Sequence, residues 1–458
     1  MKPSTLLPLL LTLYCTAVLA AARPPYGGTL RLAYAAPGAA AQAASGGSVD
    51  PALADTPLQA SLRALSSSGL CRLDGAGALQ PLLAQQLTRT RPQLLEVTLP
   101  SPALASAFAR ALARLAGTQA PSPYRALLHP LQGEGRRIPV SAERLQLALA
   151  YPWPDLERAL CHPALGAPEA PGPFAPGQAG LLAAQVRHPE GRPFLDAVAV
   201  SGAEERELSR RLESSEAALV LGGPAAPTGT AAPAALHATY LAYSPRRLPP
   251  QLRDAVESVL DRAELLRLYV RGPAQPMTAL LPPALLPPPA AVRPRPAPPA
   301  SAGGRRVSLA YDAQQEDQRA VAERLQVKLH ERGYAVALLP LERAALRARW
   351  ASGDFELMLH AVLLPPVPSL ALAVVLDTGG RRDLLGVELP RLGRVADAAA
   401  RDALARERAL ALSASVPLIP LYARGLALRA RPEVAGLAWD GQGLAQLAGV
   451  WLQPAEAP

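Results

Sequence analysis

Apolar positions follow two patterns along the chain, one typical of strands and the other typical of helices. Residues 238–243 form a short run of aromatic and branched side chains, which predicts a buried strand. In residues 251–270, Leu252, Val256 and Leu260 fall on one face at spacings of four, with charged residues on the other. This stretch therefore predicts a buried strand that is followed by an amphipathic helix.

Strand and helix patterns also alternate in the second half of the chain. The runs 306–311, 334–339 and 355–360 predict strands, and a helix over 315–332 separates the first two. Gly333 stands where a helix commonly ends. Helices between successive strands favour a parallel sheet with covering helices. We therefore expect an α/β fold.

The length of 458 residues predicts at least two lobes, because single hydrophobic cores rarely grow so large. Residues 281–304 carry proline at about every second or third position. This composition predicts a stiff, extended connector.

The net charge of +9 raises the question of a nucleic-acid or membrane partner. The basic groups are nearly all arginine, and they are dispersed along the chain among aspartate and glutamate. We therefore interpret the charge as a solvated basic surface and expect no nucleic-acid partner.

The N-terminus has the pattern of a secretory signal peptide over residues 1–22. A lysine precedes the apolar run 6–13, and small residues follow, with cleavage expected after Ala20 or Ala22. Tyr14 before Cys15 disfavours lipid attachment, because a small residue is needed there. The apolar stretch 361–376 is too short and too rich in proline to span a membrane. We expect a periplasmic protein without a membrane span.

Two cysteines, Cys71 and Cys161, remain after removal of the signal peptide. In an oxidising compartment they could form a disulfide. Two separately buried thiols are the alternative, and the spacing does not decide between them.

Motifs for catalysis are absent from the sequence. It contains no G-x-S-x-G, H-E-x-x-H or C-x-x-C, and no phosphate-binding G-x-x-x-x-G-K-[ST]. Cys161 and His162 are the only close pair of metal-ligand type, and a lone pair is interpreted as structural. We expect no enzyme activity, no catalytic or metal-binding residues and no cofactor.

Several segments together resemble one family. The N-terminal matches are Gly27, Gly28, Leu30, Asp50, Pro51, Gly69, Leu70, Asp74, Pro81, Leu83 and Ala84. They follow the pattern "G-G-x-L … L-D-P … Y-E-G-L-x-x-x-D … P-x-L-A" of extracellular solute-binding proteins family 5, the peptide- and nickel-binding subunits of ABC importers. The segment 236–264 and the run Val416–Tyr422, with its "x-P-x-I-P-L-Y" pattern, also resemble this family. One family segment is almost missing, since Leu95–Leu99 runs directly into Pro100, so a small subdomain is expected to be trimmed.

The resemblance implies a two-lobed periplasmic binding protein-like fold of type II, large variant, with mixed sheets flanked by helices and a ligand cleft between the lobes. Lobe 1 would cover residues 23–240, with 423–458 returning to it. Lobe 2 would cover 241–422 and contain the proline-rich segment. The chain would then cross between the lobes near Tyr243 and again near Tyr422.

The resemblance also implies function. We expect the substrate-binding component of an ABC importer, a monomer that captures a peptide-like or other small solute and delivers it to a permease and ATPase complex. The expected ligand-binding residues are Gly69, Cys71, Phe174, Tyr243, His360, Val362 and Tyr422. His360 could equally be a structural histidine. The alternative function is a non-transport sensor or envelope interaction protein that kept the fold and lost the pocket.

The ligand is expected to differ from that of peptide-binding relatives. In those relatives a "G-W-x-x-D-Y-x-D-P" segment follows the strand equivalent to 355–359, and an aspartate there holds the amino terminus of the peptide. Here the continuation 360–368 is apolar and rich in proline. A buried ammonium without a carboxylate partner would be costly. We therefore expect an apolar or anionic ligand, or loss of transport binding, rather than free peptides held by their amino termini.

Overall fold

The computed structural model describes most of the chain. The described residues are 24–36, 51–53, 55–117, 120–131, 138–178, 180–223, 235–248, 251–286 and 304–453. The predicted signal peptide and most of the proline-rich segment lie outside these residues.

The first lobe is built on a six-stranded sheet in the order β18-β11-β1-β10-β9-β8. The strands are β1 (Thr29–Ala35), β8 (Phe174–Pro176), β9 (Leu181–Ala184), β10 (Ala197–Ala203), β11 (Leu219–Leu221) and β18 (Leu428–Ala430). The central strand β1 runs parallel to β10 and β11, and β9 and β18 are antiparallel to their neighbours. Leu208 of α5 (Glu205–Glu213) packs on one face, and Leu65 of α2 (Pro57–Ser66) on the other.

A smaller sheet of four antiparallel strands completes the first lobe, in the order β4-β5-β7-β6. Its strands are β4 (Gln86–Arg91), β5 (Leu94–Thr98), β6 (Val140–Ser141) and β7 (Arg144–Ala148), and α3 (Pro102–Ala116) packs beside it. The sheet is therefore present although the family's sequence segment is almost missing. Ser101 and Pro102 start α3, because the Ser101 hydroxyl accepts the Leu104 N–H at 3.3 Å and proline suits the first turn.

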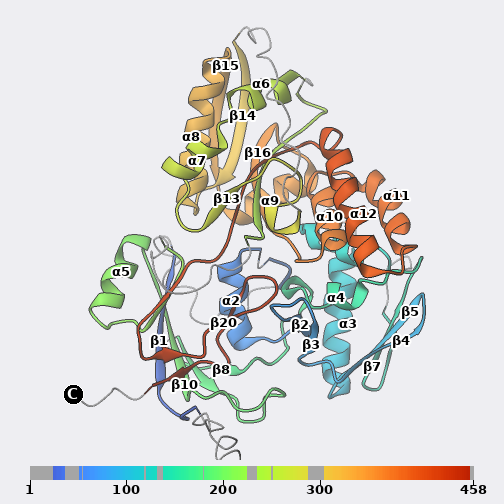
Figure 1. The fold of residues 1–458 in the computed structure, drawn as a ribbon, viewed down its shortest axis with the longest axis vertical. Helices are drawn as coiled ribbons and strands as arrows, with labels where there is room; N and C mark the ends of the chain where they lie inside the picture. The colour runs from blue at the N-terminus through green and yellow to red at the C-terminus, as the bar shows by residue number, and fades with distance from the viewer. Residues whose placement is uncertain are drawn as a thin grey trace, which may run out of the picture.

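The second lobe is built on another six-stranded sheet, in the order β13-β17-β12-β16-β14-β15. Its strands are β12 (His237–Tyr243), β13 (Ala274–Pro276), β14 (Arg305–Asp312), β15 (Tyr334–Leu341), β16 (Leu357–Leu363) and β17 (Leu418–Arg424). Strand β14 is parallel to β15 and β16, whereas β12 is antiparallel to β16 and β17. The predicted parallel unit is confirmed, and the sheet as a whole is mixed. Figure 1 shows this lobe above the first.

Helices cover both faces of the second sheet. One face packs against α6 (Gln251–Val259), α7 (Arg262–Leu268) and α8 (Glu316–His330). The helix predicted over 251–270 is thus divided in two, because Asp261 caps α7 by accepting the Glu264 N–H at 2.9 Å. The other face packs against α9 (Arg343–Ser352) and α10 (Pro368–Thr378), and α11 (Arg382–Gly393) and α12 (Ala398–Ala411) follow.

Short elements complete the described structure. The 3-10 helices are η1 (Pro51–Leu53), η2 (Pro123–Leu128), η3 (Pro163–Leu165), η4 (Pro283–Leu285) and η5 (Leu412–Ala414), and α4 (Leu156–Ala159) is one turn of α-helix. Two-stranded sheets pair β2 (Cys71–Leu73) with β3 (Leu79–Pro81), β19 (Val434–Ala435) with β22 (Trp451–Leu452), and β20 (Ala438–Trp439) with β21 (Ala445–Gln446). Among the described residues, no helix has the length and apolar character of a membrane span.

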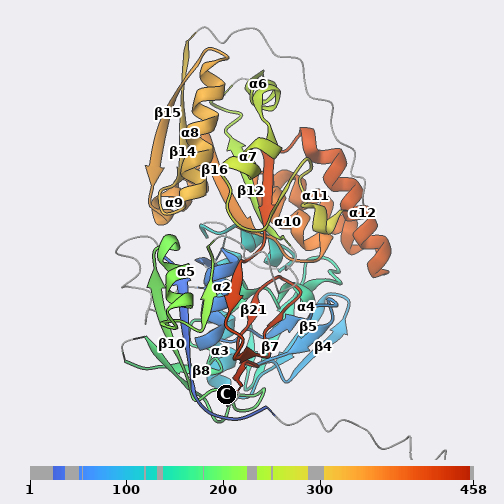
Figure 2. The ribbon, with the colours of Figure 1, turned by 60° about the vertical axis from the view of Figure 1, so that its left-hand side comes forward.

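The chain passes between the lobes at one end of two paired strands. Strands β12 and β17 lie side by side, with His237 opposite Arg424. Both strands belong to the second sheet over their whole length, so the passages lie before His237 and after Arg424 (Figure 2). The expected crossing near Tyr243 is displaced, because Tyr243 lies at the other end of β12. Tyr422 lies near the other end of its strand, two residues before β17 ends at Arg424.

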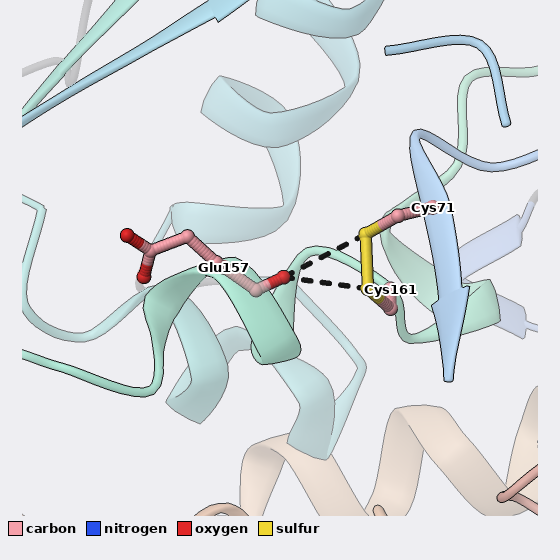
Figure 3. The surroundings of a disulfide bond; sticks show 3 residues. All are labelled: Cys71, Glu157 and Cys161. Carbon is pink, nitrogen blue, oxygen red and sulfur yellow. Dashed lines mark hydrogen bonds between the residues drawn. A yellow bond between two sulfur atoms is a disulfide. The ribbon is translucent and has the colours of Figure 1, made fainter. Parts of the chain in front are cut away.

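Cys71 and Cys161 form a disulfide across a sequence separation of 90 residues. Cys71 begins β2, and Cys161 follows α4. Both sulfur atoms lie beside the main-chain carbonyl oxygen of Glu157, at 3.6 and 3.4 Å (Figure 3). Of the two alternatives that the sequence left open, the structure therefore shows the bonded pair.

We predict that replacing both cysteines, Cys71→Ser with Cys161→Ser, lowers the free energy of unfolding by about 2–5 kcal/mol. The reason is that the bond removes conformational freedom from the unfolded chain. Urea unfolding of the double variant and the wild type, each with and without reductant, measures the effect. Reductant should destabilise only the wild type, and equal responses of the two proteins would contradict the bond.

Candidate ligand site

An acidic residue of the first lobe meets two basic residues of the second. Asp55 lies between η1 and α2, and Arg343 and Arg347 lie one turn apart on α9, so their side chains share a face. The Asp55 carboxylate accepts hydrogen bonds from Arg347 Nη2 at 2.6 Å and from Nε at 3.1 Å. Arg343 Nη1 lies 3.8 Å from Asp55, and its Nε donates to Asp312 at 2.9 Å. Charges from both lobes therefore converge at this point of the interface.

Electrostatics at this point keep Asp55 ionised. Burial acts to raise the pKa of Asp55, but the positive charges of Arg343 and Arg347 outweigh it and lower that pKa below the usual range. Burial also acts to lower the pKa of Arg343, but Asp55 and Asp312 raise it overall. Both members of the pair thus carry their charges at neutral pH.

Two histidines of the second sheet complete the cluster. His237 begins β12 and His360 lies in β16, and both are buried. Burial lowers the pKa of His237 to about 3 and that of His360 to about 4, although Asp55 acts to raise both. Both rings are therefore neutral at pH 7, so each offers one donor and one acceptor nitrogen.

Two polar atoms of this cluster lack a hydrogen-bond partner among the described residues. They are Oδ1 of Asp55 and Nε2 of His237, and both atoms are buried. Buried polar atoms are paired in most proteins, because leaving one unpaired costs about 1–3 kcal/mol. We call Asp55, His237, Arg343, Arg347 and His360 the interlobe cluster, and its unpaired atoms make it the candidate ligand site.

Trp350 and Arg125 border the interlobe cluster. The Trp350 ring lies 5.4 Å from the His360 ring, and the Arg125 guanidinium lies 5.1 Å from the Trp350 ring centre. Trp350 Nε1 donates to the Thr378 carbonyl oxygen at 2.9 Å, and Arg125 Nε donates to Asp377 at 2.8 Å. These bonds hold the Trp350 and Arg125 side chains in place. Arg125 belongs to the first lobe.

The lobes are in direct contact beside Trp350 and Arg125. Arg401 of α12 donates two hydrogen bonds to Asp155, at 2.6 and 2.7 Å, and Ser369 of α10 donates another at 2.5 Å. All three side chains are buried, and one hydrophobic cluster continues from Trp153 of the first lobe to Leu370 of α10. Within the described residues, this part of the interface is a shared core where we expected an open cleft, because ion pairs and apolar side chains fill it. Figure 1 shows α10, α11 and α12 above α3 and α4, and α10 contacts η2 of the first lobe.

The structure does not bring the sequence-predicted ligand residues into one site. His360 lies in the interlobe cluster. Gly69 and Cys71 line a pocket inside the first lobe. Phe174 is buried in the core of the first sheet, and Val362 is buried in the shared core.

Tyr243 and Tyr422 lie with the core on the α6–α8 face of the second sheet. The Tyr422 hydroxyl donates to Asp317 of α8 at 3.3 Å. Neither tyrosine is therefore placed toward His360, which lies on the opposite face of the sheet.

Sequence reasoning missed Asp55, His237, Arg343 and Arg347. One signal was available, because Asp55 follows Asp50 and Pro51, which match the family pattern. The sequence could not predict that Asp55 pairs with Arg347, since the two residues are 292 positions apart. Only the folded chain brings these residues together.

Comparisons with known proteins define the class of fold. No family model matches the sequence, and no curated protein matches it. Solved structures of two-lobed periplasmic binding proteins do match, and the chain has their fold. This result confirms the resemblance to extracellular solute-binding proteins family 5 at the level of the fold.

Three solved structures illustrate the match. The Helicobacter pylori periplasmic binding protein DppA, in complex with the peptide STSA, has a TM-score of 0.74 at 16% identity, over 94% of this chain and 99% of that chain. The Bacillus subtilis oligopeptide-binding protein AppA, in complex with a nonapeptide, has a TM-score of 0.71 at 14% identity, over 94% and 100%. Staphylococcus aureus NikA, in complex with Ni(L-His)2, has a TM-score of 0.69 at 12% identity, over 93% and 100%.

We predict that the protein loses stability as the pH falls from 6.5 towards 4. In this range the unfolded state binds a proton at His360, whose ordinary pKa is 6.5, but the folded state does not until the pH reaches about 4. The contribution is therefore complete above pH 6.5 and decreases on acidification, by about 2–3 kcal/mol at pH 4.5.

Urea unfolding of His360→Gln at pH 7 and pH 4.5 tests this, because the variant should lose that part of the pH dependence. His330→Gln, at an exposed position on α8, is the matched control and should keep the wild-type difference. An unchanged pH dependence in His360→Gln would contradict burial of the neutral ring.

We also predict that Arg401→Met lowers the free energy of unfolding by about 3–5 kcal/mol, because it leaves the buried Asp155 carboxylate without its charged partner. Thermal and urea unfolding measure the loss. Glu407→Met changes an exposed position of the same helix and should cost under about 0.5 kcal/mol. Equal effects of the two variants would argue against a buried pair between the lobes.

Proposed function

We propose that this chain is the solute-binding component of an ABC importer, which binds a small solute where its two lobes meet and delivers it to a membrane permease. The observation that carries the proposal is the interlobe cluster. Asp55 of the first lobe faces Arg343 and Arg347 of the second, and among the described residues neither Asp55 Oδ1 nor His237 Nε2 has a hydrogen-bond partner. Binding sites in proteins of this shape commonly lie between domains.

The two connections between the lobes suit such a role. We propose that the lobes divide between residues 221 and 237 and again between 424 and 428, where the chain leaves one sheet and enters the other. Two adjacent connections permit a hinge motion. Contacts made by both lobes exist only when the lobes are together, so a ligand that bridges them shifts the population to the closed form.

The proposed location is the periplasm. The signal peptide predicted over residues 1–22 would export the chain. The disulfide between Cys71 and Cys161 is consistent with an oxidising compartment. The sequence contains no phosphate-binding loop of its own, so a separate ATPase would drive transport.

The proposed ligand is a small solute with at least one N–H or O–H donor for Asp55 Oδ1. We propose that it is not a free peptide held by its amino terminus. Leu363 and Leu364, which end β16 and follow it, are fully buried, and the Leu363 N–H donates to the Tyr124 hydroxyl at 3.1 Å. Asp55 itself is bound by Arg347, so an ammonium group would have to compete with a guanidinium for it.

A second function is favoured by a different observation. Buried ion pairs and a continuous apolar core already join the lobes at Asp155, Ser369 and Arg401. A protein that kept the fold without opening would suit a sensor or interaction role at the cell envelope. The two functions differ in whether a solute is bound and whether the lobes separate.

We predict that native mass spectrometry of the protein, purified under non-denaturing conditions, detects a bound small molecule. Asp55→Asn and Arg347→Leu should reduce the bound fraction at least tenfold, since a charge-assisted hydrogen bond is worth about 1.5–3 kcal/mol. Arg349→Leu, on the same helix, is the matched control and should retain the ligand.

Small-angle scattering before and after removal of the ligand should show the lobes opening. The import proposal would be abandoned if no molecule co-purifies and no peptide, sugar or metal in a panel raises the unfolding temperature. A scattering profile that never changes, together with that result, would favour the sensor or interaction role.

A further inference from the structure

Gly393 brings the main chain of the second lobe close to the main chain of the first. It is the last residue of α11, and it is buried. A Cβ atom on Gly393 would lie 2.1 Å from the carbonyl oxygen of Pro152, although Cβ atoms essentially never come within 3.0 Å of such an atom. Gly393 has an ordinary helical backbone, so its missing side chain serves this close approach and not a special conformation.

The segment that follows Pro152 is held firmly within the first lobe. Trp153 is only 1% exposed, and Arg89 of β4 donates from Nη2 to the Trp153 carbonyl oxygen at 3.0 Å. Arg89 Nε also donates to Glu157 of α4 at 2.8 Å. The disulfide then joins Cys161 to β2. The Pro152 carbonyl group therefore cannot move far without disturbing these contacts.

The turn that follows Gly393 is held equally well in the second lobe. Arg401 Nη1 donates to the carbonyl oxygens of Val395 and Ala396 at 2.7 and 3.0 Å. The Nε and Nη2 atoms of the same side chain donate to Asp155 of the first lobe at 2.7 and 2.6 Å. One guanidinium thus ties this turn to the first lobe. A side chain at position 393 would therefore push against two braced pieces of main chain.

The same part of the first lobe also contacts both sides of the interlobe cluster. His162 Nδ1 accepts the Ala164 N–H at 3.2 Å, so Nε2 carries the proton and donates to the Leu363 carbonyl oxygen at 3.4 Å. Leu363 ends β16, the strand that contains His360. In the first lobe, η3 contacts η1, which lies just before Asp55. The approach of the lobes at Gly393 therefore affects where Asp55 and His360 meet.

We propose that Gly393 is a positioning residue that sets how closely the two lobes approach when they close. A side chain there meets the Pro152 carbonyl group before closure is complete. Even a methyl group requires a gap wider by about 1 Å, since 2.1 Å must become at least 3.0 Å. Packed interiors transmit such a shift, so the 2.6 Å hydrogen bond from Arg347 to Asp55 would lengthen beyond the usual range. The proposal concerns the closed arrangement and does not require a bound solute.

Pulsed electron paramagnetic resonance tests the proposal with spin labels at Ser141→Cys in the first lobe and Ala403→Cys in the second. Both positions are exposed, and Cys71 and Cys161 take no label because they are bonded to each other. Gly393→Ala should lengthen the distance between the labels by about 1 Å or more. Gly393→Leu should lengthen it further, because its side chain is longer.

Gly386 provides the matched control. It lies in the same helix, and among the described residues a Cβ atom there would meet nothing within 4 Å beyond the helix backbone. Gly386→Ala and Gly386→Leu change helix propensity in the same way, but they should leave the label distance unchanged. The proposal would be overturned by an unchanged distance in both Gly393 variants, or by equal lengthening in the Gly386 variants.

Folding of the variants separates a positioning role from a structural one. Gly393→Ala should keep the circular dichroism of the wild type, because its methyl group separates the lobes without entering the core of either one. If Gly393→Ala fails to fold while Gly386→Ala folds, the glycine is needed for folding itself, and that outcome also contradicts the proposal.

A second readout rests on the function proposed above. Where a solute co-purifies with the wild type, Gly393→Ala should lower the bound fraction by about tenfold, the loss expected for one charge-assisted hydrogen bond. Gly393 itself meets Pro152 and Tyr151, not the interlobe cluster. Gly386→Ala should retain the solute. Absence of any solute from the wild type would count against the proposed function alone, because the label distances report closure without a solute.

Discussion

The antiparallel pairing of β12 with β17 is the constraint on which the arrangement of the two lobes depends. Both strands belong to the second sheet, and His237 of one lies opposite Arg424 of the other at the end where the chain enters and leaves. Because the two connections are adjacent, the lobes can face each other. The described strands provide no third connection between the lobes. On its other edge β12 pairs with β16, which brings His360 next to the interface.

The interface combines two kinds of contact with opposite consequences. At Asp155 and Arg401, buried charges are fully paired within a continuous apolar core, which holds the lobes together. At Asp55, Oδ2 accepts hydrogen bonds from Arg347, whereas the buried Oδ1 has no hydrogen-bond partner among the described residues. Breaking a buried pair by removing one partner is costly, because it leaves a buried charge without its counter-charge.

Prediction from the sequence succeeded where local pattern was enough. The helix over 315–332 and its flanking strands appear as α8, β14 and β15, because their apolar spacing matches the period of each element. Prediction was less successful for the helix over 251–270, where the capping preference of Asp261 outweighed the continuous amphipathic pattern. Of the expected ligand residues, only His360 reached the candidate site, since burial in a core and exposure to a cleft produce the same apolar signature.

The amino-acid sequence by itself determined the class of fold and the order of its elements, because hydrophobic periodicity, caps and family-like segments are local properties. Only the tertiary structure decided that Cys71 and Cys161 are bonded, and that Asp55 meets Arg347 from 292 positions away. It also decided that the Gln442 side chain is buried, with no hydrogen-bond partner for its carboxamide among the described residues. Such features depend on which distant segments approach one another, and the spacing of residues along a chain carries no information about that distance in space.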